Sequence, residues 1–270
     1  MIGIVCSRLD SASRNMEARI ISANDFDAVE GQRYLKYEGE QARIYEIDAF
    51  PYLADFADGF GCDALLFLSR HRSAAGRDAL TTHSPGNWRS TADIGGKPKQ
   101  LSSAAPALML SVLTSLGKIE LDVEKTYEAT HHGPLLKTPS LFAEVGGSDK
   151  MVENKEAASR AGDAVFAAVV SVANGEAEFQ KVAVGIGSNH YPEKFSSLAL
   201  TKGYAFSHIM PKYAILNEDG SNNLDVLAQT MERSAPPPEA AVIDWKSMNA
   251  PSREQTIKKL GEIGLDYERV

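Results

Sequence analysis

Cysteine is scarce in this sequence: Cys6 and Cys62 are the only two in 270 residues. Two thiolates cannot form a structural zinc site by themselves, because such sites use four protein ligands. Both cysteines border apolar runs, and free cysteine is among the most frequently buried residue types. We therefore expect two buried, reduced thiols without a disulfide, which is typical of a cytoplasmic protein.

Long hydrophobic runs are also missing. No apolar segment approaches the roughly 20 residues that a membrane-spanning helix needs. The first residues, Met1–Ser7, lack the basic start and the longer apolar stretch of a signal peptide, and their pattern predicts a strand. We expect a cytoplasmic protein with no membrane partner.

Positive charge is in deficit, with 28 Lys and Arg against 36 Asp and Glu and a net charge of -8. This balance argues against a general binder of DNA or other nucleic acids, because affinity for phosphate comes mainly from Lys and Arg. The stretch from Ser69 to Gln100 differs, since it holds six basic residues and two acids. It is either a local site for a phosphate-bearing substrate or an ordinary solvated loop.

Several familiar catalytic motifs are absent, among them a Gly-x-Ser-x-Gly elbow, a catalytic cysteine context and His-Glu-x-x-His. Histidine is present instead, and five of the six lie in short polar clusters: His71, His83, His131, His132 and His190. Imidazole transfers protons near neutral pH and is the commonest metal ligand. Because several clusters follow apolar runs typical of buried strands, we expect an enzyme.

Apolar runs alternate with turn residues in a way that predicts an α/β fold, without internal repeats. The expected strands are Ile2–Cys6, Arg43–Asp48, Ala64–Leu68, Ala79–His83, Leu141–Val145 and Lys181–Ile186, with Ala199–Ile209 and Ala240–Ile243 as weaker candidates. The expected helices are Ala12–Ser22, Ser102–Leu116, Glu153–Val172, Asn223–Glu232 and Arg253–Ile263, the last with a capping box from Ser252 to Gln255. Ala64–Leu68 is a continuous apolar run, which predicts a central strand with a polar cluster at its carboxyl end.

The segment Glu128-Ala129-Thr130-His131-His132-Gly133-Pro134 is the most specific local signal. If it is extended, Glu128 and Thr130 share one face, and the two imidazoles on the following turn can be directed to different partners. The alternative is a pair of surface histidines without a role. Glu144 lies inside an apolar strand, which suggests either a functional carboxylate or a salt bridge to a structural arginine.

Two further clusters suit substrate binding. Ser69-Arg70-His71-Arg72-Ser73 offers two guanidinium groups for phosphate, and Gly95-Gly96-Lys97-Pro98-Lys99 adds two cations. Gly185-Ile186-Gly187-Ser188-Asn189-His190 lacks the ending of a P-loop and the spacing of a dinucleotide fingerprint. A tight turn after a strand that presents His190 is the better interpretation, and the alternative is a turn with a satisfied histidine.

These motifs, in this order and over nearly the whole chain, resemble the archaeal and plant type of D-aminoacyl-tRNA deacylase. The resemblance rests on the Arg70–Arg72 cluster, on Leu80-Thr81-Thr82-His83-Ser84-Pro85-Gly86-Asn87, on the Lys97–Lys99 segment, on Glu128–Pro134 and on Pro139-Ser140-Leu141-Phe142-Ala143-Glu144-Val145-Gly146. Two departures are Ser188 and Asn189 in a run that is glycine in the family, and Val152 in place of a tryptophan.

The resemblance implies one compact α/β unit over residues 1–270, with a three-layer α/β/α phosphorylase/hydrolase-like core around a mixed sheet, similar to peptidyl-tRNA hydrolase, and an additional α/β subdomain. It also implies zinc-dependent hydrolysis of the ester in D-aminoacyl-tRNA. We expect the protein to be a monomer. The other hypotheses are a metal-dependent amidase or peptidase acting on a small substrate, and a non-catalytic protein that binds the tRNA end.

The expected site residues fall into three groups. Catalytic candidates are His131, His132, Thr130, Glu128, His71 and His190. Substrate-binding candidates are Arg70, Arg72, Asn87, Lys97, Lys99, Gly187 and Tyr191. Metal ligands are expected among His71, His83, His131, His132, Glu144 and His190, and the sequence leaves the subset open.

Overall fold

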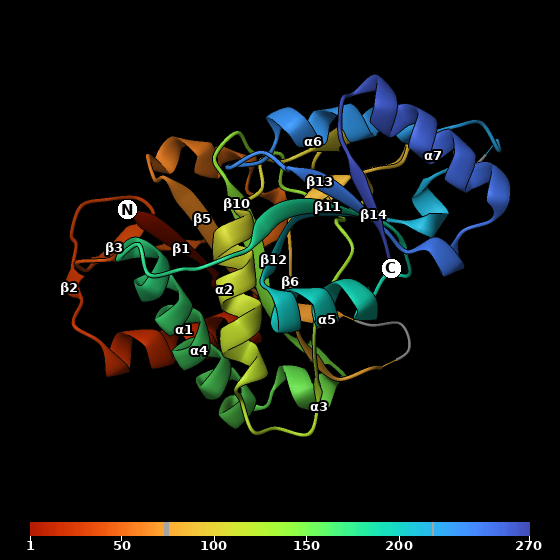
Figure 1. Ribbon diagram of the computed structural model, residues 1–270. Coiled ribbons are helices and arrows are strands. Elements are labelled where there is room, and N and C mark those ends of the chain that lie inside the picture. Colours follow the sequence, from red (N-terminus) through yellow and green to blue (C-terminus); the bar gives the residue numbers. More distant parts are fainter. Residues whose placement is uncertain (73–75, 218) are drawn as a thin grey trace.

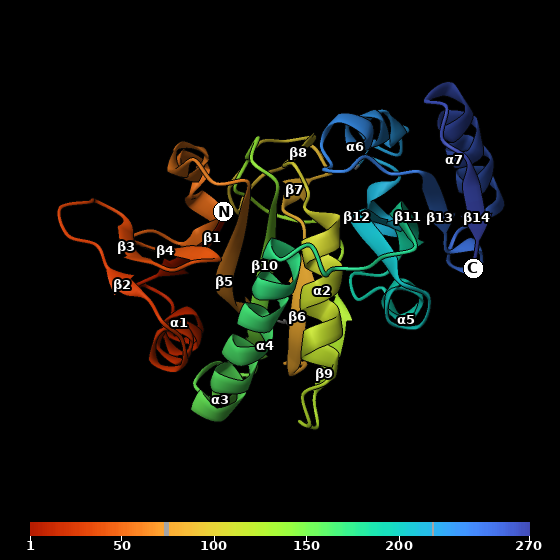
Figure 2. The same cartoon turned by 60° about the vertical axis from the view of Figure 1, so that its left-hand side comes forward.

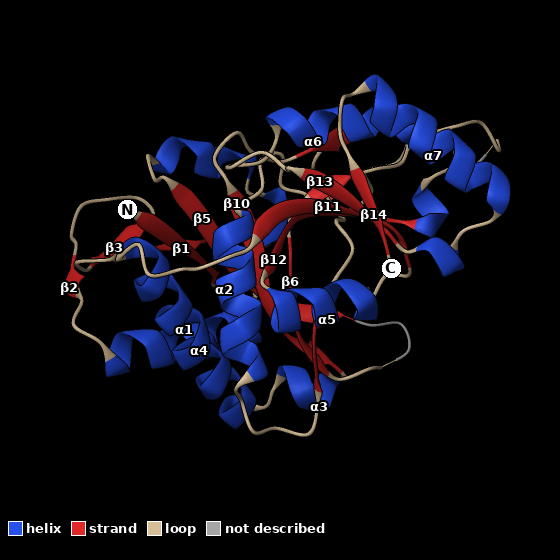
Figure 3. Cartoon of the chain, in the orientation of Figure 1, coloured by secondary structure: helices blue, strands red, loops and turns tan. Residues whose placement is uncertain are grey.

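A large mixed sheet forms the body of the molecule (Figures 1 and 3). The computed structural model describes residues 1–72, 76–217 and 219–270, so Ser73 of the arginine cluster lies outside the described residues. The strand order is β2-β3-β4-β1-β5-β10-β6-β9. Their bounds are β1 Ile2–Ser7, β2 Asp27–Ala28, β3 Leu35–Glu38, β4 Ala42–Ile47, β5 Ala64–Arg72, β6 Ala79–His83, β9 Glu124–Tyr127 and β10 Ser140–Gly147.

Long helices cover one face of this sheet, and short 3₁₀ segments cover the other. Figure 2 shows α1, α4 and α2 side by side on the first face, with the short α3 below α4. The opposite face carries two 3₁₀ helices that enclose a small core with Val5, Phe67 and Phe142. The bounds are α1 Ser11–Ala23, α2 Pro106–Gly117, α3 Asp149–Val152 and α4 Lys155–Ala173, with 3₁₀ helices at Pro51–Leu53 and Asp55–Phe60.

A second, all-parallel sheet of four strands lies beyond α2, in the order β12-β11-β13-β14. Its elements are β11 Lys181–Ser188, β12 Tyr204–Pro211, β13 Ala240–Ile243, β14 Tyr267–Arg269, α5 Glu193–Lys202, α6 Gln229–Glu232 and α7 Ala250–Glu262. A short hairpin of β7 Gly86–Asn87 and β8 Gln100–Leu101 lies near α6 (Figure 2). The expected α/β fold with a mixed sheet is present.

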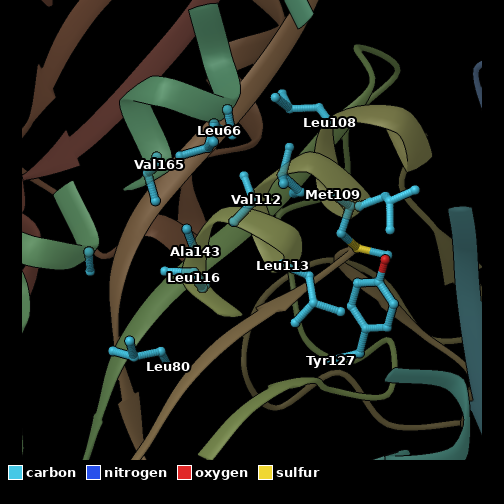
Figure 4. Packing of buried hydrophobic residues seen from close by; sticks show 14 of the residues in the cluster. Leu66, Leu80, Leu108, Met109, Val112, Leu113, Leu116, Tyr127, Ala143 and Val165 are labelled. Carbon is cyan, nitrogen blue, oxygen red and sulfur yellow. The ribbon is translucent and has the colours of Figure 1, made fainter. Parts of the chain in front are cut away.

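Helix α2 joins the two sheets through one continuous apolar cluster. Figure 4 shows Leu108, Val112 and Leu116 of α2 packed with residues of the large sheet and with Val165 of α4. The same cluster includes Phe206 of the smaller sheet. Pro106 at the first turn of α2 has no N–H to lose, and the apolar residues that follow bury most of the helix.

Several expected boundaries need correction. Ala199–Ile209 is not one strand, because its first residues belong to α5, and the left-handed Gly203 separates the helix from β12. The segment Asn223–Glu232 is a 3₁₀ helix over Leu224–Ala228 followed by the short α6. The helix expected from Ser102 begins at Pro106, because a proline fits only the first turn.

The capping and cysteine predictions also change in detail. Asn249, rather than Ser252, caps α7, and its side chain accepts a hydrogen bond from the Ser252 backbone N–H. Both cysteines are free, as expected, but only Cys6 is fully buried. Over the described residues, the structure has no helix with the length and apolar character needed to cross a membrane.

Candidate active site

The site lies where loops leave the carboxyl ends of several strands. Strand β5 is parallel to β1 and β10 at the centre of the large sheet, and it continues through the arginine cluster to Arg72. His71 therefore belongs to the end of the strand, two residues beyond the register pair of Ser69 and Glu144, and its own register partner is Gly146. This position agrees with the rule that open α/β sheets bind ligands at the carboxyl ends of their strands.

Five histidines from four segments meet beside the central strands β5 and β10. His83 ends β6, which is antiparallel to β10, and its ring stacks on Phe142 at 5.1 Å. His131 and His132 follow β9, and their ring centroids lie 4.2 Å and 4.9 Å from that of His83. His190 comes from the turn after β11 and contacts His131 at 4.8 Å between centroids. The fifth is His71, at the end of β5.

The rings of His83, His131 and His132 all use Nδ1 for a hydrogen bond to a backbone carbonyl. Their Nδ1 atoms lie 3.3 Å, 2.8 Å and 2.6 Å from the backbone carbonyls of Ser84, Ala129 and Gly133, respectively, so Nδ1–H donates in each case. Nε2 is therefore the nitrogen with the free lone pair. One ligand atom from each ring lies within 4.8 Å of the other two. The two adjacent histidines can therefore contribute to one grouping, and His131 also belongs to the grouping with Glu128 and His190.

Burial keeps two of these rings neutral. It lowers the pKa of His132 to about 4, with His83 adding repulsion, and it lowers the pKa of His131 well below the ordinary value, with His83 and His132 contributing. A buried imidazole loses hydration of its charged form, and neighbouring cations act in the same direction. Burial also lowers the pKa of His83, but Glu144 and Glu128 outweigh it and raise that pKa, so His83 must release its proton before it can bind a metal. The neutral form is the one that binds metals.

A second cluster, formed by His71, Glu128 and Glu144, is buried and charged. His71 Nδ1 lies 3.0 Å from Glu128 Oε1 and 3.5 Å from Glu144 Oε2, and its Nε2 bonds Tyr191 OH at 2.8 Å. Burial lowers the pKa of His71, but the two carboxylates outweigh it and raise that pKa to about 11. Glu144 lies between His71 and His83 and has no arginine partner among the described residues, so its charge belongs to the site.

Glu128 also holds His190. Its Oε2 accepts from His190 Nε2 at 2.8 Å, while His190 Nδ1 lies 3.2 Å from Tyr213 OH. Burial opposes ionisation of Glu128, but His190 and His71 outweigh it and hold its pKa well below the usual range. The carboxylate thus hydrogen-bonds His190 on one side and pairs electrostatically with His71 on the other.

A cavity of about 450 Å³ opens over these clusters. Seven predicted residues line it: Arg70, His71, Arg72, His131, His132, Glu144 and His190. Sequence reasoning missed six other lining residues: Asp10, Phe50, Pro51, Tyr52, Ser69 and Ile94. Asp10 carried a usable signal, because it precedes a Ser-rich helix start directly after the first strand, and it caps α1.

Three of the remaining candidates have structural contacts just outside the described lining of the cavity. Thr130 Oγ1 accepts from the Ile209 backbone N–H at 3.0 Å and ties the histidine loop to β12. Asn87 Nδ2 donates to Gly95 O at 2.9 Å. Tyr191 OH is hydrogen-bonded to Nε2 of His71, which lines the cavity.

The other substrate-binding candidates also lie outside the described lining. Gly187 packs against Met248, where a Cβ would come within 2.4 Å of the sulfur. The Lys99 carbonyl accepts from Gln229 Nε2 at 2.7 Å, and Lys97 is exposed on the same loop. The sixth histidine, His208, is buried away from the cluster, where its Nε2 bonds Ser102 O at 3.0 Å.

The donor set fits a metal ion such as zinc. His83 Nε2 and Glu128 Oε1 are buried without a hydrogen-bond partner among the described residues. The Glu128 oxygen is close to His71, but the approach lacks hydrogen-bond geometry. Three groupings bring ligand atoms within 4.8 Å: His83 with His131 and His132, Glu128 with His131 and His190, and His71 with Glu128 and Glu144. The first suits zinc best, because backbone carbonyls orient all three of its imidazoles through Nδ1.

Comparison with known proteins agrees with this geometry. A family model described as D-aminoacyl-tRNA deacylase matches residues 59–268. The chain belongs to the D-aminoacyl-tRNA deacylase family. It is 33% identical over 277 residues to the D-aminoacyl-tRNA deacylase of Pyrococcus furiosus, with 98% of each chain covered. The corresponding protein of Methanosarcina mazei is 31% identical over 281 residues, covering 98% of this chain and 90% of its own.

A solved structure shares the fold of this family member. The crystal structure of AF0625, a conserved protein of unknown function, is similar with a TM-score of 0.88 at 29% identity. The match covers 100% of this chain and 95% of the other. The α/β fold expected from the resemblance is therefore confirmed, with both sheets included in the match.

Proposed function

We propose that this chain hydrolyses the ester bond of D-aminoacyl-tRNA, releasing the free D-amino acid and tRNA. The observation that carries the proposal is the convergence of three oriented imidazoles beside buried carboxylates, with His131, His132 and Glu144 on the wall of one cavity and His83 buried behind it. Family membership supports the substrate class. An aminoacyl ester is activated, so a positioned water, a base and stabilisation of the developing oxyanion suffice.

His83, His131 and His132 would hold a zinc ion, whose chemistry when bound is to lower the pKa of a water to about 7 and to polarise a carbonyl. The chain's own residues prepare that site. The Ser84, Ala129 and Gly133 carbonyls fix the tautomers, so each ring presents Nε2 before any ligand arrives.

His190 is the proposed general base. Its Nε2–H is held by Glu128, which leaves Nδ1 to accept a proton, with Tyr213 OH as the neighbouring hydroxyl. A carboxylate that orients the imidazole and stabilises its protonated form follows the logic of a catalytic triad. His71 is proposed to position Glu128 from the other side, since its imidazolium keeps that carboxylate ionised and in place.

One experiment tests the function against its alternatives. Purified protein is incubated with D-Tyr-tRNA and with L-Tyr-tRNA, each with and without a chelator. We expect much faster hydrolysis of the D form and its loss on chelation. Equal rates on both forms refute the assignment. Binding without hydrolysis supports a non-catalytic tRNA-end binder, and activity only on small amides supports a metal-dependent amidase.

We further propose that binding of tRNA uses Arg70, Arg72, Lys97 and Lys99, because they lie in the one basic stretch of an acidic chain. The arginines line the cavity, whereas the lysines lie outside its described lining. The double change Lys97→Gln and Lys99→Gln should therefore weaken tRNA binding. It should also make the plot of log affinity against log salt concentration less steep, by an amount that corresponds to up to two phosphate contacts. Unchanged affinity at every salt concentration contradicts this assignment.

We propose that the enzyme is a cytoplasmic monomer and that residues 1–270 act as one unit. We also propose that it does not bind DNA. The free thiols of Cys6 and Cys62 support a reducing compartment, and the net charge of -8 supports the absence of general DNA binding. Light scattering and a DNA-binding titration at low salt test the monomer and the absence of DNA binding directly.

A further inference from the structure

One wall of the cavity is aromatic, and the proposed function does not account for it. We call Phe50, Pro51 and Tyr52 the aromatic wall. The Phe50 and Tyr52 rings are nearly parallel, with 8° between their planes and 5.4 Å between centroids. Both rings are half-buried and line the cavity, whereas the large aromatic residues of the core, such as Phe67, are fully buried. With 5.4 Å between their centroids, the two rings do not fully cover one another.

Backbone packing holds the aromatic wall against the turn that carries His131 and His132. The Gly133 N–H donates to Ile94 O at 2.8 Å, beside His132. At Gly95, whose φ is +72°, a Cβ would lie 1.9 Å from the Tyr52 carbonyl oxygen, and at Gly133 a Cβ would lie 2.4 Å from it. Such close backbone packing fixes the separation between the wall and the His132 ring, which lies 6.1 Å from Tyr52 between centroids.

Two guanidinium groups flank the same wall. The Arg70 guanidinium lies 5.4 Å over the Phe50 ring, and Arg72 is exposed at the cavity edge. Asp10 also lines the cavity, but it accepts from the Arg70 backbone N–H at 2.9 Å and does not engage the guanidinium by a hydrogen bond. Among the described residues, neither guanidinium has a carboxylate within ion-pair distance. Both cations are therefore available to an anion.

We infer that the aromatic wall, with Arg70 and Arg72, binds the terminal adenosine 5′-phosphate of the tRNA. This inference rests on the proposed function. Parallel aromatic rings accept a base by stacking, and arginine pairs with phosphate in two-point contacts. The ester links the 3′-terminal ribose to the amino acid, so a base on this wall places the ester toward His132. The other possible occupant, the amino-acid side chain, would not need two guanidinium groups.

A binding measurement tests the wall without catalysis. AMP is titrated into the wild-type protein, Phe50→Leu and Phe50→Tyr, and binding is followed by NMR or calorimetry. Phe50→Leu keeps an apolar side chain but loses the π face, so AMP affinity should fall roughly 5- to 150-fold, which corresponds to about 1–3 kcal/mol per stacked base. Phe50→Tyr should retain binding. Phe56→Leu is the matched control, because Phe56 stacks on Tyr34 outside the described cavity lining.

Kinetics provide the second measurement. On D-Tyr-tRNA, Phe50→Leu should raise KM or lower kcat/KM, whereas hydrolysis of D-tyrosine ethyl ester, which carries no nucleotide, should stay within about twofold of wild type. An equal loss on both substrates, or a loss that follows the size of the amino-acid side chain, places the side chain on this wall and overturns the inference. So does a wild-type protein that does not bind AMP at millimolar concentration.

The two proposals fail in different ways. If the wild-type protein does not hydrolyse D-Tyr-tRNA, the proposed function is wrong, whatever AMP does. If it hydrolyses D-Tyr-tRNA and Phe50→Leu leaves both AMP affinity and the rate on tRNA unchanged, only the inference about the aromatic wall is wrong.

Discussion

Glu17 should make the stability of this protein depend on pH. This residue of α1 is 7% exposed, and its Oε1 has no hydrogen-bond partner among the described residues. Burial and the neighbouring carboxylate of Glu46 raise the pKa of Glu17 to about 8 from an ordinary value of 4.5. The folded state therefore holds a proton at neutral pH that the unfolded chain has already released.

The direction follows from this difference in bound protons. Stability falls as pH rises wherever the folded state binds more protons than the unfolded state, here from about pH 4.5 to about pH 8. One group changes the free energy of unfolding by at most about 1.4 kcal/mol per pH unit, so the loss of free energy of unfolding between pH 5.5 and 7.5 is about 2.5 kcal/mol. For a chain of this size, that corresponds to a decrease in Tm of roughly 5–10 °C.

Thermal or urea unfolding of wild type and Glu17→Gln across this pH range provides the test. Glutamine keeps the shape and cannot ionise, so the difference between the two proteins should grow steadily toward high pH in favour of the variant. Glu178→Gln is the control, because Glu178 is exposed. Parallel stability curves for wild type and Glu17→Gln would falsify the assignment of a buried protonated carboxyl.

The remaining predictions concern the site. Glu128→Gln should lower kcat on D-Tyr-tRNA by about 10²–10⁴-fold, because His190, the proposed base, loses the carboxylate that orients it. A smaller decrease of the rate in single-turnover assays would contradict this role of Glu128. His83→Gln should reduce bound zinc measured by elemental analysis, while His208→Gln, a buried histidine outside the cluster, should retain it. Gly95→Ala should lower the free energy of unfolding by at least about 2 kcal/mol, because its Cβ meets the carbonyl of the aromatic wall, whereas Gly59→Ala, with open space around it, should not.

Much of the fold was predictable because its strands carry strong signals. Continuous apolar runs mark β5 and β10, and the structure places them side by side and parallel at the centre of the large sheet. The missed elements are short or polar. Strand β9 has the sequence Glu-Lys-Thr-Tyr, which has little apolar character, and it pairs only because β6 offers a free edge. Such pairing depends on tertiary context rather than local pattern.

The site was predictable in composition but not in arrangement. Histidine clusters and Glu144 stood out because polar side chains beside buried strands are unusual. The division of roles required geometry: which ring nitrogen is free depends on carbonyls such as that of Ala129, and these are invisible in a sequence. Phe50 and Tyr52 were missed for the opposite reason, since aromatic residues are most often core and nothing in their spacing indicates a cavity wall.

The charge of the site explains how an acidic protein can handle an anionic substrate. Glu128 and Glu144 would repel a phosphate, but His71 pairs with both carboxylates. None of the three is more than 5% exposed, although His71 and Glu144 line the cavity. The charges that reach the cavity edge are those of Arg70 and Arg72. A phosphate arriving from solvent therefore meets cations first, in a chain whose net charge is -8. Both arginines line the same cavity as Phe50, Tyr52 and the histidines, so an anion held by them lies in that cavity.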